Sequence, residues 1–246
     1  MAEEYKKVEK EDQEFERRTL ARESVNLITL FTGVLYGELD ERLGIIDAIK
    51  KNLKKPVPSH VNWTFCFGGV SFFLFLVLLV TGTLLMLYYR PTTRQAYQSV
   101  VLITNVVPYG WLIRGLHHWA ANLMILMVIS HMIKVFFYGA YKPPRDFNWV
   151  VGVVLLILIL AFGFSGYLLP WSQVSYWATT VVTDATGAFP LIGKKLEYFI
   201  RGGPELSQLT LNRFFTLHVI ILPALTFIFL FLHFGMVRKQ GISGPL

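Results

Sequence analysis

The sequence predicts an all-α membrane protein, built as a bundle of four transmembrane helices with an N-terminal amphipathic helix on the membrane surface. Only 16% of its 246 residues are charged and 54% are hydrophobic, whereas a soluble domain carries about a quarter charged residues. Four long stretches lack Asp, Glu, Lys and Arg altogether: residues 57–89, 115–133, 147–183 and 214–237. Because a helix needs ~20 apolar residues to cross the hydrocarbon core, each stretch is long enough to hold a span.

The first 55 residues differ from the rest of the chain. They hold 11 Lys/Arg and 12 Asp/Glu, and only 4 acidic residues follow them. We expect residues 1–30 to be a charged, flexible extension. In residues 31–55, Leu39, Leu43 and Ile46 recur at near-helical spacing among charged residues, which predicts an amphipathic helix at the interface.

Residues 56–246 hold the predicted bundle, with spans at about 64–89, 114–138, 148–169 and 214–237. The third charge-free stretch is too long for one span. We expect Pro170 to end the helix there, leaving residues 171–183 as a short segment at the interface.

The net charge of +7 comes from basic residues at the ends of the apolar runs, which is a membrane topology signal and not a nucleic-acid-binding stripe. Their bias predicts that both termini are cytoplasmic. Residues 1–23 contain no apolar stretch typical of a secretory signal. The spans at 114–138 and 214–237 then run in the same direction, from the outer face to the inner face.

Four of the six histidines lie inside these two co-directional spans, where ionisable residues are costly and indicate function. His117 and His131 are 14 residues apart, and His218 and His233 are 15 apart, which is about 21 Å along a helix. His117 can therefore meet His218 near the outer face (the outer pair), and His131 can meet His233 near the inner face (the inner pair). Two imidazoles without a nearby carboxylate or thiolate suit six-coordinate haem iron better than zinc. Interhelical hydrogen bonds or a proton path remain the alternative.

Glycines on the other two spans repeat this spacing. Gly68 and Gly82 are fourteen residues apart, and so are Gly152 and Gly166. Such pairs often serve close helix packing. Their match to the histidine spacing favours a second use, which is backbone clearance for the edge of a flat macrocycle at two depths.

Basic residues flank the histidines. Arg114 and Arg213 precede the outer-pair histidines and Lys134 follows His131, so each could bind a haem propionate or simply lie at the interface.

Cys66 is the only cysteine, which excludes an internal disulfide framework. By itself it is typical of an inert apolar residue, and a C-x-x-C-H motif is absent. His60 and His118 are predicted to be structural or interfacial.

Several motifs together resemble the cytochrome b6 family, the shorter form of the cytochrome b subunit of quinol oxidoreductases of the cytochrome bc type. The resemblance runs from about Leu39 to Leu246. The motifs are P-x-H-V-N (58–62), FCFGG (65–69), YYRPT (88–92), RGLHHW (114–119), GYLLPWSQVSYWA (166–178) and HFGMVRKQGISGPL (233–246). RGLHHW is most similar to menaquinol–cytochrome c reductases of Gram-positive bacteria.

The resemblance implies the cofactors and which residues bind them. The outer pair would bind a low-potential haem b and the inner pair a high-potential one. Cys66 aligns with a cysteine that holds a third haem, of the cn or ci type, through a single thioether. Arg238 aligns with an arginine near that haem and an inner quinone site.

The resemblance also implies the function, as the electron-transfer subunit of a menaquinol:cytochrome c or plastocyanin-like oxidoreductase. Quinol would be oxidised near residues 167–177, and a Q-cycle through the haems would build a proton gradient across a bacterial plasma membrane. Expected partners are a subunit IV-like companion with the P-E-W-Y motif, a Rieske iron–sulfur protein and a c-type cytochrome, in a dimeric complex. The chain alone would not complete the enzyme.

Two other functions compete with this interpretation. The first is a di-haem cytochrome b that anchors a dehydrogenase or hydrogenase in the membrane; this would need neither Cys66 nor GYLLPWSQ. The second is a transporter without haem, whose histidines would line a path for protons or metal ions.

Overall fold

The computed structural model describes residues 59–244 and, before them, residues 10, 13–18, 33, 44, 47 and 50. The chain divides into two compact units, Met1–Ser59 and His60–Leu246. In the first unit residues 13–18 are helical and exposed, with Arg18 bonded to Glu14 at 2.7 Å. The rest of the predicted extension (1–30) and most of the predicted interfacial helix (31–55) lie outside the described residues.

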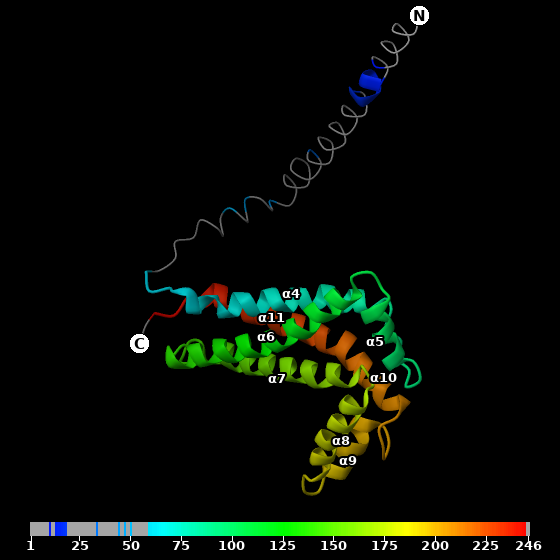
Figure 1. The fold of residues 1–246 in the computed structure, drawn as a ribbon. Helices are drawn as coiled ribbons and strands as arrows, with labels where there is room; N and C mark the ends of the chain where they lie inside the picture. Colours follow the sequence, from blue (N-terminus) through cyan, green and yellow to red (C-terminus); the bar gives the residue numbers. More distant parts are fainter. Residues whose placement is uncertain are drawn as a thin grey trace, which may run out of the picture. The chain divides into compact units, whose positions relative to one another are not determined.

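The second unit contains four helices long and apolar enough to cross a membrane: Trp63–Met86, Gly110–Phe137, Asp146–Leu168 and Gln208–Gln240. They run as a bundle (Figure 1), and the described residues form no strand. The prediction of an all-α protein with four spans is confirmed.

The structure divides two of these spans into shorter elements. The first consists of η2 (Trp63–Cys66) and α4 (Phe67–Met86). The next two are α6 (Gly110–Phe137) and α7 (Asp146–Leu168). The last consists of α10 (Gln208–Thr216), the π-helical turn η3 (Leu217–Ile221) and α11 (Leu222–Gln240). It begins before the predicted residue 214 because Ser207 caps α10, accepting a hydrogen bond from the Leu209 amide.

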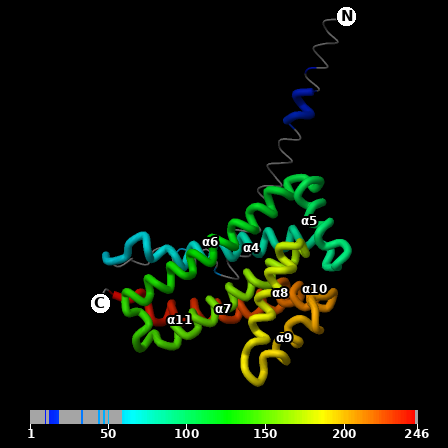
Figure 2. The backbone as a smooth tube through the Cα atoms, turned by 60° about the horizontal axis from the view of Figure 1, so that its bottom comes forward, coloured from blue at the N-terminus to red at the C-terminus, as the bar shows by residue number. Residues whose placement is uncertain are grey.

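Inside the bundle, α4 packs along α6, and α7 packs along α11 (Figure 2). A small core cluster of Phe75, Met124 and Ile159 joins α4, α6 and α7. Each of these residues is seven positions, or about two helical turns, from the two predicted histidines or glycines of its own helix. The core therefore lies midway between the two histidine levels and separates them.

The outer surface of the bundle is apolar, as lipid contact requires. Large side chains face outward along the spans, for example Phe73 at 63% exposure and Phe231 at 81%. In water such a surface would be unfavourable, but in a bilayer it contacts hydrocarbon.

Three further helices lie at the end of the bundle nearer to His117 and His218 (the outer end, named after the outer pair): α5 (Ala96–Asn105), α8 (Gln173–Gly187) and α9 (Gly193–Arg201). The predicted interfacial segment 171–183 is helical from Gln173 onward, and this helix continues to Gly187. Helices α5 and α9 were not predicted. In Figure 1, α8 and α9 lie side by side and project from the end of the bundle. A capping box between Ser172 and Ser175 starts α8 just after Pro170 ends α7.

Hydrogen bonds close the opposite end of the bundle, nearer to the inner pair (the inner end). His60, just before the first span, bonds through Nε2 to the Ser243 carbonyl at 3.0 Å. Arg145 donates to the Gln240 carbonyl at 3.2 Å, and Gln240 donates to the Pro144 carbonyl at 2.8 Å. The start and the end of the bundle therefore meet at one face.

Candidate functional site

The structure brings the four intramembrane histidines together as two facing pairs, each with one ring from α6 and one from α11 or its π turn. The ring centroids of His117 and His218 are 6.4 Å apart, with an interplanar angle of 65°. Those of His131 and His233 are also 6.4 Å apart, at 82°. The outer and the inner pair thus have nearly the same arrangement of rings.

This separation matches what a single metal ion between two imidazoles requires. A metal–nitrogen bond is about 2 Å, and the centre of a five-membered ring is roughly 1.1 Å from each atom. One such bond and one such radius on each side of the ion place the two ring centroids about 6.3 Å apart. Direct hydrogen bonding between the rings would bring them closer, so the spacing fits two axial ligands of one ion.

The histidine pairs would supply only two ligands per ion. Among the residues that the structure describes, no group of three or more His, Cys, Asp or Glu gathers that could hold a metal ion. A structural zinc site needs four protein ligands. A bis-histidine site therefore fits an ion whose other four ligands come from a macrocycle, which is haem iron.

Each predicted glycine lies against one histidine. Gly68 and Gly82 on α4 lie against His131 and His117: an added Cβ would stand 3.1 Å and 3.2 Å from their Cε1 atoms. In the structure these glycines make room for the imidazole rings, and clearance for a macrocycle edge stays a prediction.

The same holds on α7. A Cβ on Gly166 would stand 2.6 Å from Cε1 of His218, and one on Gly152 would stand 3.9 Å from Cε1 of His233. Helices α4 and α7, which carry none of the four histidines, thus each limit where two histidine rings of a neighbouring helix can lie.

The π turn explains the unequal spacing of the histidines. In a regular helix 15 residues turn about 100° further than 14, which would rotate His218 away from the direction of His233. The turn Leu217–Ile221, closed by the Leu222 amide bonding to the Leu217 carbonyl, absorbs the extra residue. Pro223, which has no amide hydrogen to donate to the Val219 carbonyl, is the sequence signal for this turn.

Two hydroxyl groups that the sequence analysis missed bond to the outer pair. Thr81 Oγ1 lies 2.9 Å from Nδ1 of His117, and Ser165 Oγ lies 3.1 Å from Nδ1 of His218. Both residues are buried. Each immediately precedes one of the predicted glycines, and that neighbourhood was the available signal.

The role of the four predicted propionate ligands stays a prediction, and the structure shows the contacts that two of them make. Arg213 donates to the Phe199 carbonyl and lies over the Phe199 ring at 5.8 Å. Lys134 lies over the Phe65 ring at 2.8 Å. Arg114 and Arg238 are exposed and form no hydrogen bond or ion pair within the described part of the chain.

Cys66 is exposed and directly precedes α4. It stands two residues before Gly68, which contacts His131, so its backbone lies near the level of the inner pair. His60 bonds to Ser243 as described above. His118 is exposed, and its carbonyl accepts a hydrogen bond from Asn122 at 3.0 Å.

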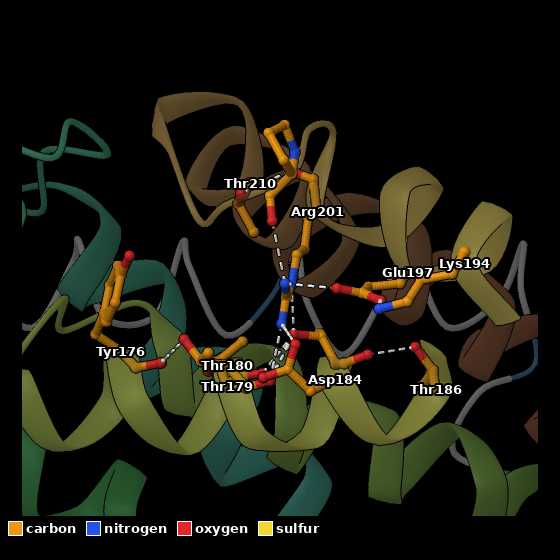
Figure 3. A network of polar contacts seen from close by, with 11 residues as sticks. Tyr176, Thr179, Thr180, Asp184, Thr186, Lys194, Glu197, Arg201 and Thr210 are labelled. Carbon is orange, nitrogen blue, oxygen red and sulfur yellow. Dashed lines mark hydrogen bonds and ion pairs between the residues drawn. The ribbon is translucent and has the colours of Figure 1, made fainter. Parts of the chain in front are cut away.

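At the outer end, a buried ion-pair network ties α8 to α9 (Figure 3). Arg201, which is 4% exposed, bonds to Glu197 at 2.7 Å and to Asp184 at 2.8 Å. It also donates to Thr183 at 2.7 Å. No pattern in the sequence indicates that a basic residue in this region is buried.

Comparisons with known proteins agree with this geometry. A family model described as cytochrome b/b6/petB matches residues 52–241. The chain is 45% identical over 212 residues to cytochrome b6 of Synechococcus sp. (strain JA-3-3Ab), covering 86% of this chain and 99% of the relative. It is 47% identical over 211 residues to cytochrome b6 of Cyanidium caldarium, covering 86% and 98%.

A solved structure, described as a hyperthermophilic respiratory Complex III, superposes with a TM-score of 0.78 at 32% identity. The match covers 84% of this chain and 55% of that chain, so this chain spans about half the length of its structural neighbour.

Proposed function

The chain belongs to the cytochrome b/b6 family, and on that premise we propose that it carries electrons across the membrane as the cytochrome b6-type subunit of a quinol oxidoreductase complex. The observation that carries the proposal is the pair of matched histidine sites, both with ring centroids 6.4 Å apart. They lie on helices long and apolar enough to span a membrane.

The outer pair would hold one haem b and the inner pair another. Haem b, when bound, supplies reversible one-electron transfer. The protein residues fix each imidazole through its glycine contact, and the core cluster of Phe75, Met124 and Ile159 keeps the two levels apart. The helices around both sites are apolar, and the polarity around a metal site influences its redox potential.

We further propose a covalent haem c at Cys66 and a quinone site beside it. The exposure of the thiol and its position near the inner pair support this proposal. Arg238 and Lys134 are the candidate cations of that inner region, and Arg114 and Arg213 those of the outer one. Menaquinol is the proposed substrate, oxidised near the exposed side chains of Tyr167 and Trp177.

The proposed partners are a companion subunit with the P-E-W-Y motif, a Rieske iron–sulfur protein and a c-type cytochrome, in a dimeric complex that runs a Q-cycle. The proposed location is a bacterial plasma membrane with both termini cytoplasmic. The His60–Ser243 hydrogen bond supports this topology in one respect, because it holds both ends of the bundle at the same face.

The test is a reduced-minus-oxidised spectrum of the purified complex, with haem quantified per chain. We expect two b-type centres, one lost in His218→Ala and the other lost in His233→Ala. His118→Ala is the matched control, since this histidine is exposed on α6 and should leave both centres intact. A spectrum without two b-type centres would defeat the proposal. Two b centres with no covalently bound haem would instead favour the dehydrogenase or hydrogenase anchor.

A further inference from the structure

The two histidine levels differ in what bonds to the Nδ1 atoms of their rings. At the outer level Thr81 and Ser165 place hydroxyl oxygens 2.9 Å and 3.1 Å from the Nδ1 atoms of His117 and His218. At the inner level Nδ1 of His233 is buried and has no hydrogen-bond partner in the described structure.

The outer hydroxyls are arranged to accept hydrogen bonds from the imidazoles. Thr81 donates its own hydrogen to the Val77 carbonyl at 2.7 Å, and Ser165 donates to the Phe162 carbonyl at 3.3 Å. Their lone pairs are therefore free to accept from the rings. An imidazole that binds a metal through Nε2 carries its hydrogen on Nδ1, so each outer ring can donate to its hydroxyl.

Backbone carbonyls do not account for the difference between the levels. The carbonyls of Leu78 and Phe162 lie near the outer rings, and that of Asn148 lies near His233 on the inner level. Both levels thus have a nearby carbonyl, but within residues 59–244 hydroxyl groups bond to the rings of the outer level only. The cause is in the sequence: the outer glycines follow Thr81 and Ser165, whereas the inner glycines follow Phe67 and Val151.

We propose that Thr81 and Ser165 are positioning residues that fix the tautomer of the outer imidazoles and lower the midpoint potential of the outer haem relative to the inner one. This inference rests on the proposed function. A hydrogen bond from Nδ1 makes Nε2 a stronger electron donor, and a stronger donor stabilises the oxidised iron. Because each hydroxyl also donates to a backbone carbonyl, the hydrogen bond from Nδ1 to the hydroxyl is polarised further.

The test is a spectroscopic redox titration of the membrane-embedded complex carrying Thr81→Val or Ser165→Ala. We expect each substitution to make reduction of the outer centre easier, by up to about tenfold in its equilibrium constant, which corresponds to 59 mV. The carbonyls of Leu78 and Phe162 remain as weaker acceptors, so a larger change is not expected. The inner centre should keep its potential. The centres are assigned to their levels with His218→Ala and His233→Ala.

Two control variants separate the hydroxyl from general disturbance of the helices. Thr81→Ser keeps the hydroxyl and should keep the wild-type potential. Thr226→Val removes a hydroxyl that is 1% exposed on α11 and bonds to no partner among the described residues, so neither centre should shift. If Thr81→Val loses the outer centre while Thr81→Ser retains it, the positioning role of the hydroxyl is supported as well.

Unchanged outer potentials in both Thr81→Val and Ser165→Ala would overturn the inference, and so would equal shifts of the two centres. In either case two b-type centres would still be present, and the proposed function would stand. Absence of those centres from the wild-type complex would instead remove the proposed function itself.

Discussion

Gly166 lies so close to the ring of His218 that a Cβ on its backbone would stand 2.6 Å from Cε1, whereas the corresponding distance from Gly152 to His233 is 3.9 Å. The first distance requires the ring or the helix to move, and the second is an ordinary van der Waals contact. The outer level is therefore more tightly built around its glycine than the inner level on the same helix.

This difference predicts opposite outcomes for the same substitution. Gly166→Ala should displace His218 and remove most of the outer b-type centre, because overpacking in a buried site costs about 1–3 kcal/mol and here falls on a ligand. Gly152→Ala is the matched control on α7 and should retain both centres. The measurement is b-haem content and spectrum per chain. Equal loss in the two variants would show that the glycine contact does not set the position of the ring.

Cys66 gives a prediction that is independent of the histidines. In Cys66→Ala and Cys66→Ser we expect the haem stain on a denaturing gel to disappear, because neither side chain can form a thioether. Both b-type centres should persist, since their ligands lie on other helices. Stain that survives in the variants would remove Cys66 from the proposed cofactor set.

The buried network at the outer end predicts a stability effect. Arg201→Met leaves Glu197, which is 8% exposed, without its buried partner, and losing one member of such a pair typically costs about 3–5 kcal/mol. Limited proteolysis within α8 and α9 should become much faster. The control is Lys194→Met, which removes the other ion pair of Glu197. The Lys194 side chain is 83% exposed, and surface pairs contribute at most about 1 kcal/mol. Equal cleavage rates in the two variants would contradict a structural role for Arg201.

The features that could be predicted from sequence are those that the lipid environment imposes locally. Long charge-free stretches specify spans, and histidines such as His117 and His131 are conspicuous there because an ionisable residue in hydrocarbon is costly. Gly68 and Gly82 could be connected to them because helical periodicity places residues fourteen apart on nearly one face. These inferences need no knowledge of how the helices pack.

The features that were missed depend on tertiary contacts. Helix α9 (Gly193–Arg201) contains several charged residues and was not predicted, and its Arg201 is buried and paired with Asp184 on α8. The hydroxyl of Thr81 bonds locally to its own helix like many threonines in membrane spans, and only the packing of α4 on α6 brings it to His117. Spacing alone could not reveal either contact.

The π turn before α11 yields a prediction about register. Each residue of an α-helix turns the chain by about 100°, so one deletion should matter differently inside and outside the turn. Deleting Ile220 together with Pro223→Ala should let η3 close as a regular helix, leaving His218 and His233 fourteen residues apart, as His117 and His131 are. Both b-type centres should then be retained. The proline must be replaced as well, because in a regular helix its ring would clash with the preceding turn.

The matched variant deletes Ile228 from the regular part of α11, which leaves the π turn in place. His233 should then rotate by about 100° away from His131, and the inner centre should be lost while the outer one remains. Spectra of the two deletion variants decide the matter. If the deletion at Ile220 removes a centre, or the deletion at Ile228 preserves both, the π turn is not what aligns the two histidines of this helix.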